Sequence, residues 1–239
     1  MSEISKISSD RRQEFVDSVL QLQPRLATFD CDGTLWKGDA GEGFFDWELK
    51  QAIVSDGVAR WARERYASYR RGEVDEDTIC GEMVTLHAGL TEAEVERAAT
   101  TYFDANFVPQ IFPEMRDMVN RLQRSGCEVW AVSSTNVWVI RAAMKHFGIP
   151  DQNILAATAR VADGVITDSL IRVPSGAGKT KAIREDIRRT PDAAFGNSIW
   201  DADMLANARH PFVVNPTPEL EKVARQRSWK VYYPDAPGA

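Results

Sequence analysis

The sequence contains few histidines and few cysteines. Its 239 residues include three of each, and no cysteine belongs to a CxxC pair or a Cys/His cluster. This spacing argues against a zinc centre and against a disulfide framework, so we expect free, buried thiols. His87, His146 and His210 are far apart in the chain. We expect them to be ordinary core or surface residues rather than metal ligands.

Signals for a membrane or for nucleic acid are also missing. No run of about 18 apolar residues occurs, which a membrane-spanning helix needs. The polar N-terminal stretch lacks the apolar segment of a signal peptide. The formal net charge is −6, whereas nucleic-acid binding normally requires a basic surface. We therefore expect a cytoplasmic protein that binds neither a membrane nor nucleic acid, and the sequence leaves the oligomeric state open.

Short apolar runs alternate with amphipathic stretches over much of the chain. The runs typical of buried strands are 25–30, 127–134, 192–197, 211–215 and 230–233. The helical patterns cover 113–126, 136–148, 178–189 and 201–209. Strands that alternate with helices of this length predict βαβ units, hence an α/β fold with a parallel sheet covered on both faces. Two β-rich runs around Asp163 and Gly164 instead predict a hairpin.

A polar, helical block interrupts this alternation after the first strand. Within it, Thr91 and Glu94 have the spacing of a helix-capping box. A helical insertion of this kind predicts a lid over the sheet. We therefore expect a core domain formed by residues 1–35 and 112–239, with a helical cap domain at 36–111.

The segment FDCDGTLW carries two carboxylates, Asp30 and Asp32, at the end of the first predicted strand. Ligands of open α/β sheets bind at this carboxyl edge. Alternate residues of a strand share a face, so the two side chains could converge on one site. Such a pair can hold a divalent cation, and one carboxylate can attack phosphorus while the other transfers protons. The alternative is a plain turn rich in aspartate and glycine.

Three later segments add polar groups at strand ends or at a helix start. Ser133 ends the second strand in VSSTN, where its hydroxyl and nearby N–H groups can bind a phosphate oxygen. Lys179 begins a helix and supplies a positive charge. Asn197 and Asp201 follow the third strand in GNSIWD and offer oxygen ligands.

Lys179 also ends the stretch VPSGAGK, which looks like part of a nucleotide-binding P-loop. That motif requires a glycine at position 173, where this chain has Val173 followed by Pro174. We therefore expect Lys179 to serve another chemistry.

Taken in order, DCDGT, the serine, the lysine and GNSxxD resemble the haloacid dehalogenase (HAD) superfamily over nearly the whole chain. The resemblance implies a Rossmann-like core with a mobile cap inserted after the first motif. It implies that Asp30 is the nucleophile and forms an aspartyl phosphate. Asp32 would protonate the leaving group and then activate water. The expected phosphate-binding residues are Ser133, Ser134 and Thr34.

The same resemblance implies that Lys179 orients the nucleophile and that Mg²⁺ is the cofactor. The expected metal ligands are Asp30, Asp32 through its main-chain carbonyl, Asn197 and Asp201. The family usually has aspartate where this chain has Asn197. The neutral amide leaves one negative charge fewer for the metal.

Within the superfamily, the residues favour a phosphatase. Dehalogenases lack the second aspartate of the first motif, and Asp32 is present. Phosphonatases use a cap lysine, but only Lys37 and Lys50 occur in the cap block, and neither lies in an apolar run. Mutases keep both aspartates and stay possible on this criterion. We expect a Mg²⁺-dependent hydrolase of a small-molecule phosphomonoester. The alternative suggested by Asn197 is a phosphate-binding protein with weak catalysis.

The cap resembles that of the phosphoserine phosphatase branch, and one departure bears on the substrate. An arginine binds the substrate carboxylate in that branch, whereas this chain has Met83. Methionine cannot form a charge-assisted pair with a carboxylate. A phosphoserine phosphatase-like activity is therefore the alternative rather than the first expectation.

The segment after the first motif points to a cationic substrate. Asp39 and Glu42 lie there among aromatic residues, a pattern that resembles phosphorylcholine phosphatases. Carboxylates and aromatic rings can bind an ammonium group. We therefore expect phosphocholine or phosphoethanolamine as the substrate. The alternative is that the aromatic residues, Trp36, Phe44, Phe45 and Trp47, only pack the cap onto the core.

Overall fold

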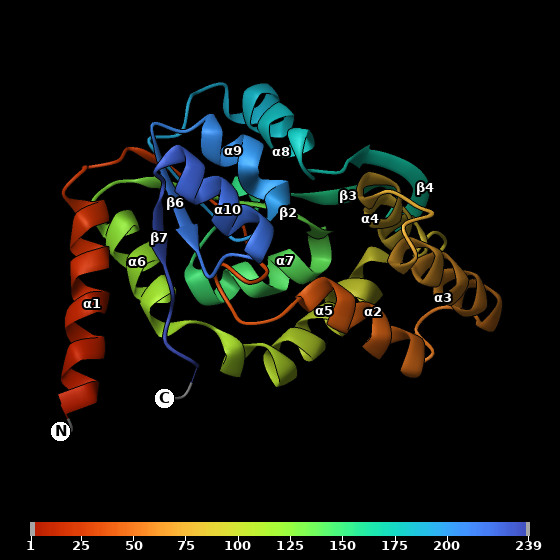
Figure 1. The fold of residues 1–239 in the computed structure, drawn as a ribbon. Coiled ribbons are helices and arrows are strands. Elements are labelled where there is room, and N and C mark those ends of the chain that lie inside the picture. Colours follow the sequence, from red (N-terminus) through yellow and green to blue (C-terminus); the bar gives the residue numbers. More distant parts are fainter. Residues whose placement is uncertain (1–2, 238–239) are drawn as a thin grey trace.

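The computed structural model describes residues 3–237, and its centre is a seven-stranded sheet with the order β4-β3-β2-β1-β5-β6-β7. Its strands are β1 Leu26–Phe29, β2 Glu128–Asn136, β3 Ile154–Ala162, β4 Val165–Arg172, β5 Ala193–Gly196, β6 His210–Val214 and β7 Lys230–Tyr232. Only the β3–β4 pair is antiparallel (Figure 1). The predicted α/β fold with a Rossmann-like parallel sheet is therefore confirmed.

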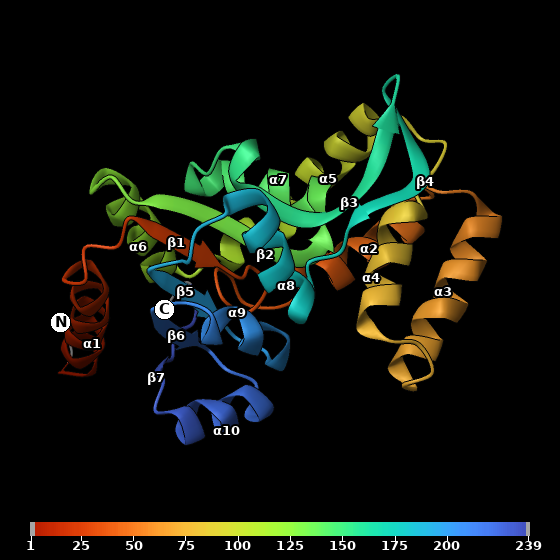
Figure 2. The ribbon, with the colours of Figure 1, turned by 90° about the horizontal axis from the view of Figure 1, so that it is seen from above.

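Helices cover both faces of the sheet (Figure 2). The α-helices are α1 Glu3–Leu20, α2 Ala40–Lys50, α3 Asp56–Arg70, α4 Glu76–Thr85, α5 Glu92–Asn106, α6 Pro113–Arg124, α7 Val137–Met144, α8 Ala177–Ala182, α9 Ala202–Ala206 and α10 Pro218–Arg227. Ala27 and Phe29 of β1 pack on the side of α6 and α7. Leu26 packs on the opposite side with α8, α9 and α10. The two-residue period of the strand thus supplies one hydrophobic core to each face.

The N-terminal helix α1 lies outside the elements that the sequence pattern predicts. Its first turns are polar, and only its last part is apolar. Val16 and Val19 are buried against the rest of the core. Phe15 stacks on Tyr232 with ring centroids 4.0 Å apart. The helix is therefore anchored by contacts with segments that are distant in sequence.

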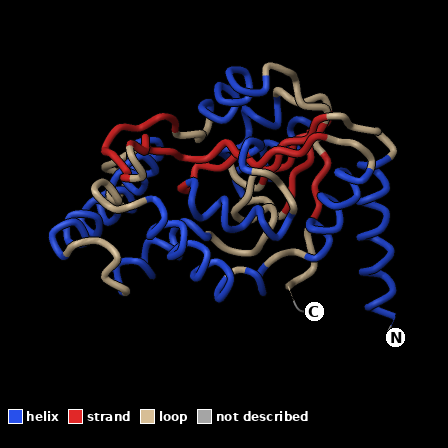
Figure 3. Tube along the Cα trace, turned by 180° about the vertical axis from the view of Figure 1, so that it is seen from behind, coloured by secondary structure: helices blue, strands red, loops and turns tan. Residues whose placement is uncertain are grey.

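Two predicted helices are broken in the structure, whereas the hairpin is confirmed. The pattern at 178–189 forms only the short α8, followed by a π-helical turn at Ile183–Ile187. The pattern at 201–209 forms the five-residue α9. Between β3 and β4, Asp163 and Gly164 have φ of 50° and 77°, the left-handed turn conformation expected of a two-residue hairpin. Figure 3 shows this hairpin extending beyond the body of the sheet.

The block predicted as a cap is helical, as expected. Thr91 and Glu94 form the predicted capping box at the start of α5. Helix α5 packs along α7, and its Phe103 belongs to the main core (Figure 1). Helices α2, α3 and α4 share a separate small core: Phe45, Leu49, Val54, Ala59, Ala62 and Leu86. The division into two domains stays a prediction.

Within residues 3–237, no helix combines the length and the apolar character that crossing a membrane requires.

Candidate active site

Three of the predicted motifs meet at the carboxyl ends of neighbouring strands. Strand β1 lies between β2 and β5, which carry Ser133 and lead into Asn197. Asp30 follows β1, and its N–H donates a hydrogen bond of 2.9 Å to the carbonyl of Phe195 in β5. The sheet order therefore places residues from three distant parts of the sequence at one edge.

Lys179 connects the first and last motifs. Its Nζ lies 2.6 Å from Oδ1 of Asp30 and 2.6 Å from Oδ1 of Asp201. The lysine side chain is only 3% exposed. Thr34 donates a hydrogen bond of 2.7 Å to the second oxygen of Asp30. Asp30 is thus held through both of its oxygens.

The charges in this cluster oppose one another. Burial lowers the pKa of Lys179, but the carboxylates of Asp201 and Asp30 outweigh it and hold the pKa above its ordinary value. Burial and the charge of Asp201 raise the pKa of Asp30 to about 6. At neutral pH the lysine is therefore charged and Asp30 is mainly ionised, which is the state that a nucleophilic carboxylate needs.

Asp32 has different partners. Its Oδ1 accepts hydrogen bonds from the N–H of Ala40 at 2.5 Å and from Nε1 of Trp36 at 2.8 Å. Its Oδ2 accepts one from Oγ1 of Thr135 at 2.8 Å. Burial and the neighbouring Asp39 raise the pKa of Asp32 to about 8. At neutral pH this carboxyl group is therefore mainly protonated and can donate a proton.

Thr135 is a site residue that the sequence reasoning missed. It follows Ser133 and Ser134 in VSSTN, so a third hydroxyl in that motif was the available signal. Its main-chain N–H donates a hydrogen bond of 3.1 Å to Oγ of Ser133. Gly41 of α2 packs closely against it, because a Cβ there would lie 2.6 Å from Oγ1 of Thr135. The second motif and the start of α2 therefore fit together around Asp32.

The acidic loop after β5 is organised by Asp201. Its Oδ2 accepts hydrogen bonds from the N–H groups of Asn197 and Ser198, both at 2.9 Å. The side chain of Asn197 packs against Gly33, where a Cβ would lie 1.9 Å from Nδ2 of Asn197. Gly33 also has φ of +73°, so glycine is required there both for space and for conformation.

The oxygen atoms at this edge of the sheet suit a hard cation such as Mg²⁺, although few of them belong to carboxylates. The carboxylate of Asp30, the main-chain carbonyl of Asp32 and the amide of Asn197 are oxygen donors of the type that Mg²⁺ binds. Asp201 already contacts Lys179 and the loop N–H groups. Within residues 3–237, no group of three or more His, Cys, Asp or Glu side chains has an arrangement suited to a metal.

A cavity between α2, α3, α4 and the end of β2 contains the predicted substrate-binding residues. It is lined by Asp39, Gly41, Glu42, Phe45, Tyr66, Tyr69, Glu76, Ile79, Cys80, Met83, Ser134, Thr135 and Asn136. The structure thus brings Asp39, Glu42 and Met83 together, and it places Ser134 beside them. The tyrosines, Glu76 and Cys80 were missed, because only the packing of α3 and α4 brings them to this wall.

The aromatic residues after the first motif have two different roles. Trp36 and Phe44 are fully buried, and the Trp36 ring packs edge-on against Phe103 with centroids 5.1 Å apart. Trp47 stacks on Phe44 with centroids 5.9 Å apart. Phe45 alone of these four lines the cavity. The packing alternative therefore holds for three of the rings.

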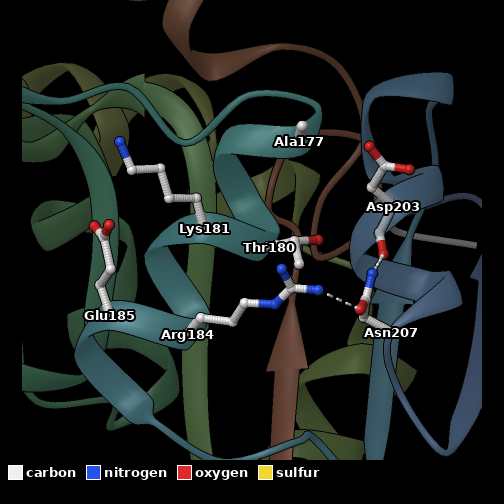
Figure 4. Close-up of a pocket in the computed structure, with 7 residues that line it drawn as sticks. All are labelled: Ala177, Thr180, Lys181, Arg184, Glu185, Asp203 and Asn207. Atoms are coloured by element: carbon white, nitrogen blue, oxygen red, sulfur yellow. Dashed lines mark hydrogen bonds between the residues drawn. The ribbon is translucent and has the colours of Figure 1, made fainter.

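Another hollow lies between α8 and α9, and none of the predicted site residues lines it. Most of its lining is polar or charged: Ala177, Thr180, Lys181, Arg184, Glu185, Asp203 and Asn207. Figure 4 shows Arg184 reaching Asn207, to which it donates a hydrogen bond of 3.1 Å. Asp203 is exposed and lines this hollow.

Comparison with known proteins gives a consistent result. The family model of haloacid dehalogenase-like hydrolases matches residues 27–206. A histidinol-phosphatase of Neisseria meningitidis is 27% identical over 217 residues, covering 86% of this chain and 97% of the relative. The phosphoserine phosphatase SerB1 of Mycobacterium tuberculosis is 24% identical over 149 residues, covering 60% of this chain and 48% of the relative.

Solved structures have the same fold. A protein of unknown function from Bordetella pertussis Tohama I has a TM-score of 0.77 at 22% identity, covering 87% of this chain and 97% of that one. An analogue of the phospho-aspartyl intermediate of phosphoserine phosphatase has a TM-score of 0.56 at 16% identity, covering 89% and 94%.

Proposed function

Because the chain belongs to the haloacid dehalogenase-like hydrolases, we propose that it hydrolyses a small phosphate monoester through an aspartyl phosphate on Asp30, with Mg²⁺ as its cofactor. The family and its phosphatase relatives make the enzyme a phosphoric monoester hydrolase. One observation carries the mechanism. Lys179 bridges Asp30 and Asp201 in a buried cluster, and Asp32 stands next to it in a separate hydrogen-bond network.

In the first step, a carboxylate oxygen of Asp30 forms a bond to phosphorus, and the bond from phosphorus to the ester oxygen breaks. Asp32 gives its proton to the departing alkoxide, which leaves as an alcohol. Its raised pKa favours this role because the acid form is present at neutral pH. Lys179 holds Asp30 in place and offsets the charge that gathers on the phosphoryl oxygens.

In the second step, water attacks the aspartyl phosphate. Asp32, now ionised, accepts the proton from that water, and inorganic phosphate leaves while the Asp30 carboxylate is restored. The predicted phosphate-binding groups are Ser133, Ser134 and Thr34. Thr34 donates a hydrogen bond to Asp30 in the free enzyme. During the reaction, its hydroxyl would either turn toward the phosphate group or continue to orient Asp30.

The predicted ligands of Mg²⁺ are Asp30, the carbonyl of Asp32, Asn197 and Asp201. The metal would supply Lewis-acid stabilisation of the phosphoryl charge when it is bound. Asn197 contributes a neutral amide, so we expect weaker Mg²⁺ binding than an aspartate would give. Asp201 would act mainly by holding Lys179 and the loop that carries Asn197.

The lining of the cavity between α2, α3, α4 and the end of β2 supports a substrate with a positive charge. Asp39, Glu42 and Glu76 line it, and its lining within the described residues contains no lysine or arginine. Met83 takes the position that would bind a carboxylate, so phosphoserine fits poorly. We propose phosphocholine or phosphoethanolamine. Histidinol phosphate, suggested by the name of the Neisseria relative, also carries an ammonium group and belongs in the same test.

A phosphate-release screen tests this function. The substrates are phosphoethanolamine, phosphocholine, histidinol phosphate, phosphoserine, glucose 6-phosphate and p-nitrophenyl phosphate, each with Mg²⁺ and with EDTA. We expect turnover that needs Mg²⁺ and that favours the cationic esters. No turnover of any ester above an Asp30→Asn background would instead support the phosphate-binding alternative. Faster hydrolysis of phosphoserine or the sugar phosphate would reject the cationic substrate.

A further inference from the structure

Glu76 is a carboxylate of the substrate cavity that no step of the mechanism uses. It begins α4, directly after the helix-capping Asp75. Its Oε2 accepts a hydrogen bond from the hydroxyl of Tyr69, and its Oε1 accepts one from Sγ of Cys80 at 3.7 Å. Both donors are neutral, so they orient the carboxylate without cancelling its charge. Glu76 is half-buried and lines the cavity, and among the residues that the structure describes no lysine or arginine lines it. A carboxylate in this position favours a cationic ligand.

The opposite wall of the cavity is also acidic. Asp39 caps α2, and its Oδ1 accepts the N–H of Glu42 at 2.8 Å. Glu42 has a cationic neighbour, Arg70, but their atoms are 3.3 Å apart and the Arg70 side chain is 69% exposed. Such an exposed pair neutralises little charge. A group bound between α2 and α4 would therefore face carboxylates from both helices.

The aromatic rings of this cavity are packed against one another. Phe45 and Tyr66 have ring centroids 5.0 Å apart, and those of Tyr66 and Tyr69 are 5.8 Å apart. Both pairs are tilted, with interplanar angles of 35° and 47°, so the three rings form one connected apolar wall of the cavity. Burial and the adjacent Glu42 raise the pKa of Tyr66, so its hydroxyl stays protonated.

Resting on the phosphatase function above, we propose that Glu76, with Asp39 and Glu42, selects esters whose ammonium group carries N–H bonds. Each N–H can donate a charge-assisted hydrogen bond to a carboxylate, whereas a trimethylammonium group has no donor. The substrate class is thus the phosphate ester of a primary or secondary amino alcohol. Of the two substrates proposed above, phosphoethanolamine is preferred over phosphocholine, and Glu76 is a specificity-determining residue.

The test measures kcat/KM for three matched esters and one reference. Phosphoethanolamine, phosphocholine and ethyl phosphate differ only at the far end of the alcohol, and p-nitrophenyl phosphate reports the phosphatase chemistry alone. We expect kcat/KM for phosphoethanolamine to exceed that for each of the other two by about tenfold or more. Glu76→Gln, which keeps an acceptor for Tyr69, should lower the ratio of kcat/KM for phosphoethanolamine to kcat/KM for ethyl phosphate about tenfold.

Glu73→Gln is the control, because Glu73 lies three residues earlier, pairs with Arg71 at the surface and is outside the cavity lining. Glu73→Gln should change kcat/KM for neither phosphoethanolamine nor p-nitrophenyl phosphate. Equal rates for the three esters, or a preference for phosphocholine, would overturn the proposal while the phosphatase function stands. An equal loss for p-nitrophenyl phosphate in Glu76→Gln would also overturn it, since Glu76 would then act structurally. Failure of every ester in the native enzyme with Mg²⁺ would instead reject the phosphatase function and the proposal with it.

Discussion

Two acidic regions of this molecule handle charge in opposite ways. At the sheet edge, Asp30 and Asp201 are buried and share one lysine at 2.6 Å. In the cap cavity, Asp39, Glu42 and Glu76 line a space whose described lining has no basic side chain. At the sheet edge, one lysine offsets part of the charge of two carboxylates. The described lining of the cap cavity offers no such cation, and on our proposals the chemistry belongs to the first region and the choice of substrate to the second.

Substituting the nucleophile should have the largest effect on the rate. Asp30→Asn removes the attacking carboxylate, and we expect turnover of every ester to fall on the order of 10⁴-fold or more. The measurement is steady-state phosphate release with p-nitrophenyl phosphate. Asp203→Asn is the matched control, because Asp203 lies in the exposed hollow near α9 and should leave the rate unchanged. Near-full activity of Asp30→Asn would refute the assigned nucleophile.

Removing the shared lysine should affect both the rate and the stability. Lys179→Met leaves two buried carboxylates without their cation, which should cost about 3–5 kcal/mol in free energy of unfolding. The chemical step should slow on the order of 10²-fold or more, because the charge that offsets the phosphoryl group is lost. Urea denaturation and single-turnover kinetics measure the two effects. Lys181→Met is the control, because Lys181 lies two residues later on the exposed side of α8. It should change neither the free energy of unfolding nor the rate of the chemical step.

A buried pair between α2 and the end of α4 can be tested by pH. Nε2 of His87 lies 2.6 Å from Oε2 of Glu48, and Nδ1 donates to the carbonyl of Val84 at 3.0 Å. Both side chains are at most 1% exposed. Burial lowers the pKa of His87, but Glu48 and the hydrogen bonds outweigh it and raise the pKa overall. The pair therefore joins the ends of α2 and α4, and it is an ion pair when His87 is protonated.

His87→Gln should lower the free energy of unfolding by about 3 kcal/mol, because Glu48 loses its cation. Since the folded pKa is raised, the contribution is fully present below the unfolded value of about 6.5 and fades as pH rises through the folded value. The difference from the native protein should thus be larger at pH 6 than at pH 9 in urea titrations. His210→Gln, at the surface, is the control. A difference that grew with pH would contradict the ion pair.

The smallest effect is expected at the surface of the cap. Arg65 binds both oxygens of Glu82 at 2.7–3.0 Å, which keeps Glu82 turned toward α3 and leaves it outside the cavity lining. The side chains are 33% and 22% exposed. Arg65→Met should cost about 1 kcal/mol or less in thermal or urea unfolding, and Arg60→Met should be neutral. A change in the preference between phosphoethanolamine and ethyl phosphate would show that Glu82 reaches the substrate after all.

The predicted site and the observed one agree most closely where short motifs follow strands. The sequence predicts that Asp30, Ser133 and Asn197 each lie at the carboxyl end of a strand, and the sheet order makes those ends neighbours. Asp30 and Asn197 directly follow β1 and β5, whereas β2 continues past Ser133 to Asn136. The partners of Asp32 were harder to predict. Thr135 and the N–H of Ala40 come to it only because α2 packs against the end of β2.

The positions of several residues in the cap could not be predicted from the sequence. The sequence leaves Trp36 and Phe44 equally suited to a ligand or to packing, and their complete burial shows that both rings pack in the core. The sequence does not identify Glu76 and Tyr69 as cavity residues, because a helix-terminal glutamate and a tyrosine on a polar helix usually face water. Their meeting depends on the angle between α3 and α4, which no local pattern specifies.

By itself, the sequence determined the α/β class, the helical block after the first strand and the residues of the predicted motifs. Those features depend on local periodicity, on glycine turns such as that at Gly33 and on residue types at strand ends, all of which are written in short stretches. Only the tertiary structure decided that Lys179 lies between Asp30 and Asp201, and that three carboxylates of the cap share one cavity. Both arrangements arise from contacts between segments far apart in the chain, whose energies depend on packing rather than on neighbouring residues.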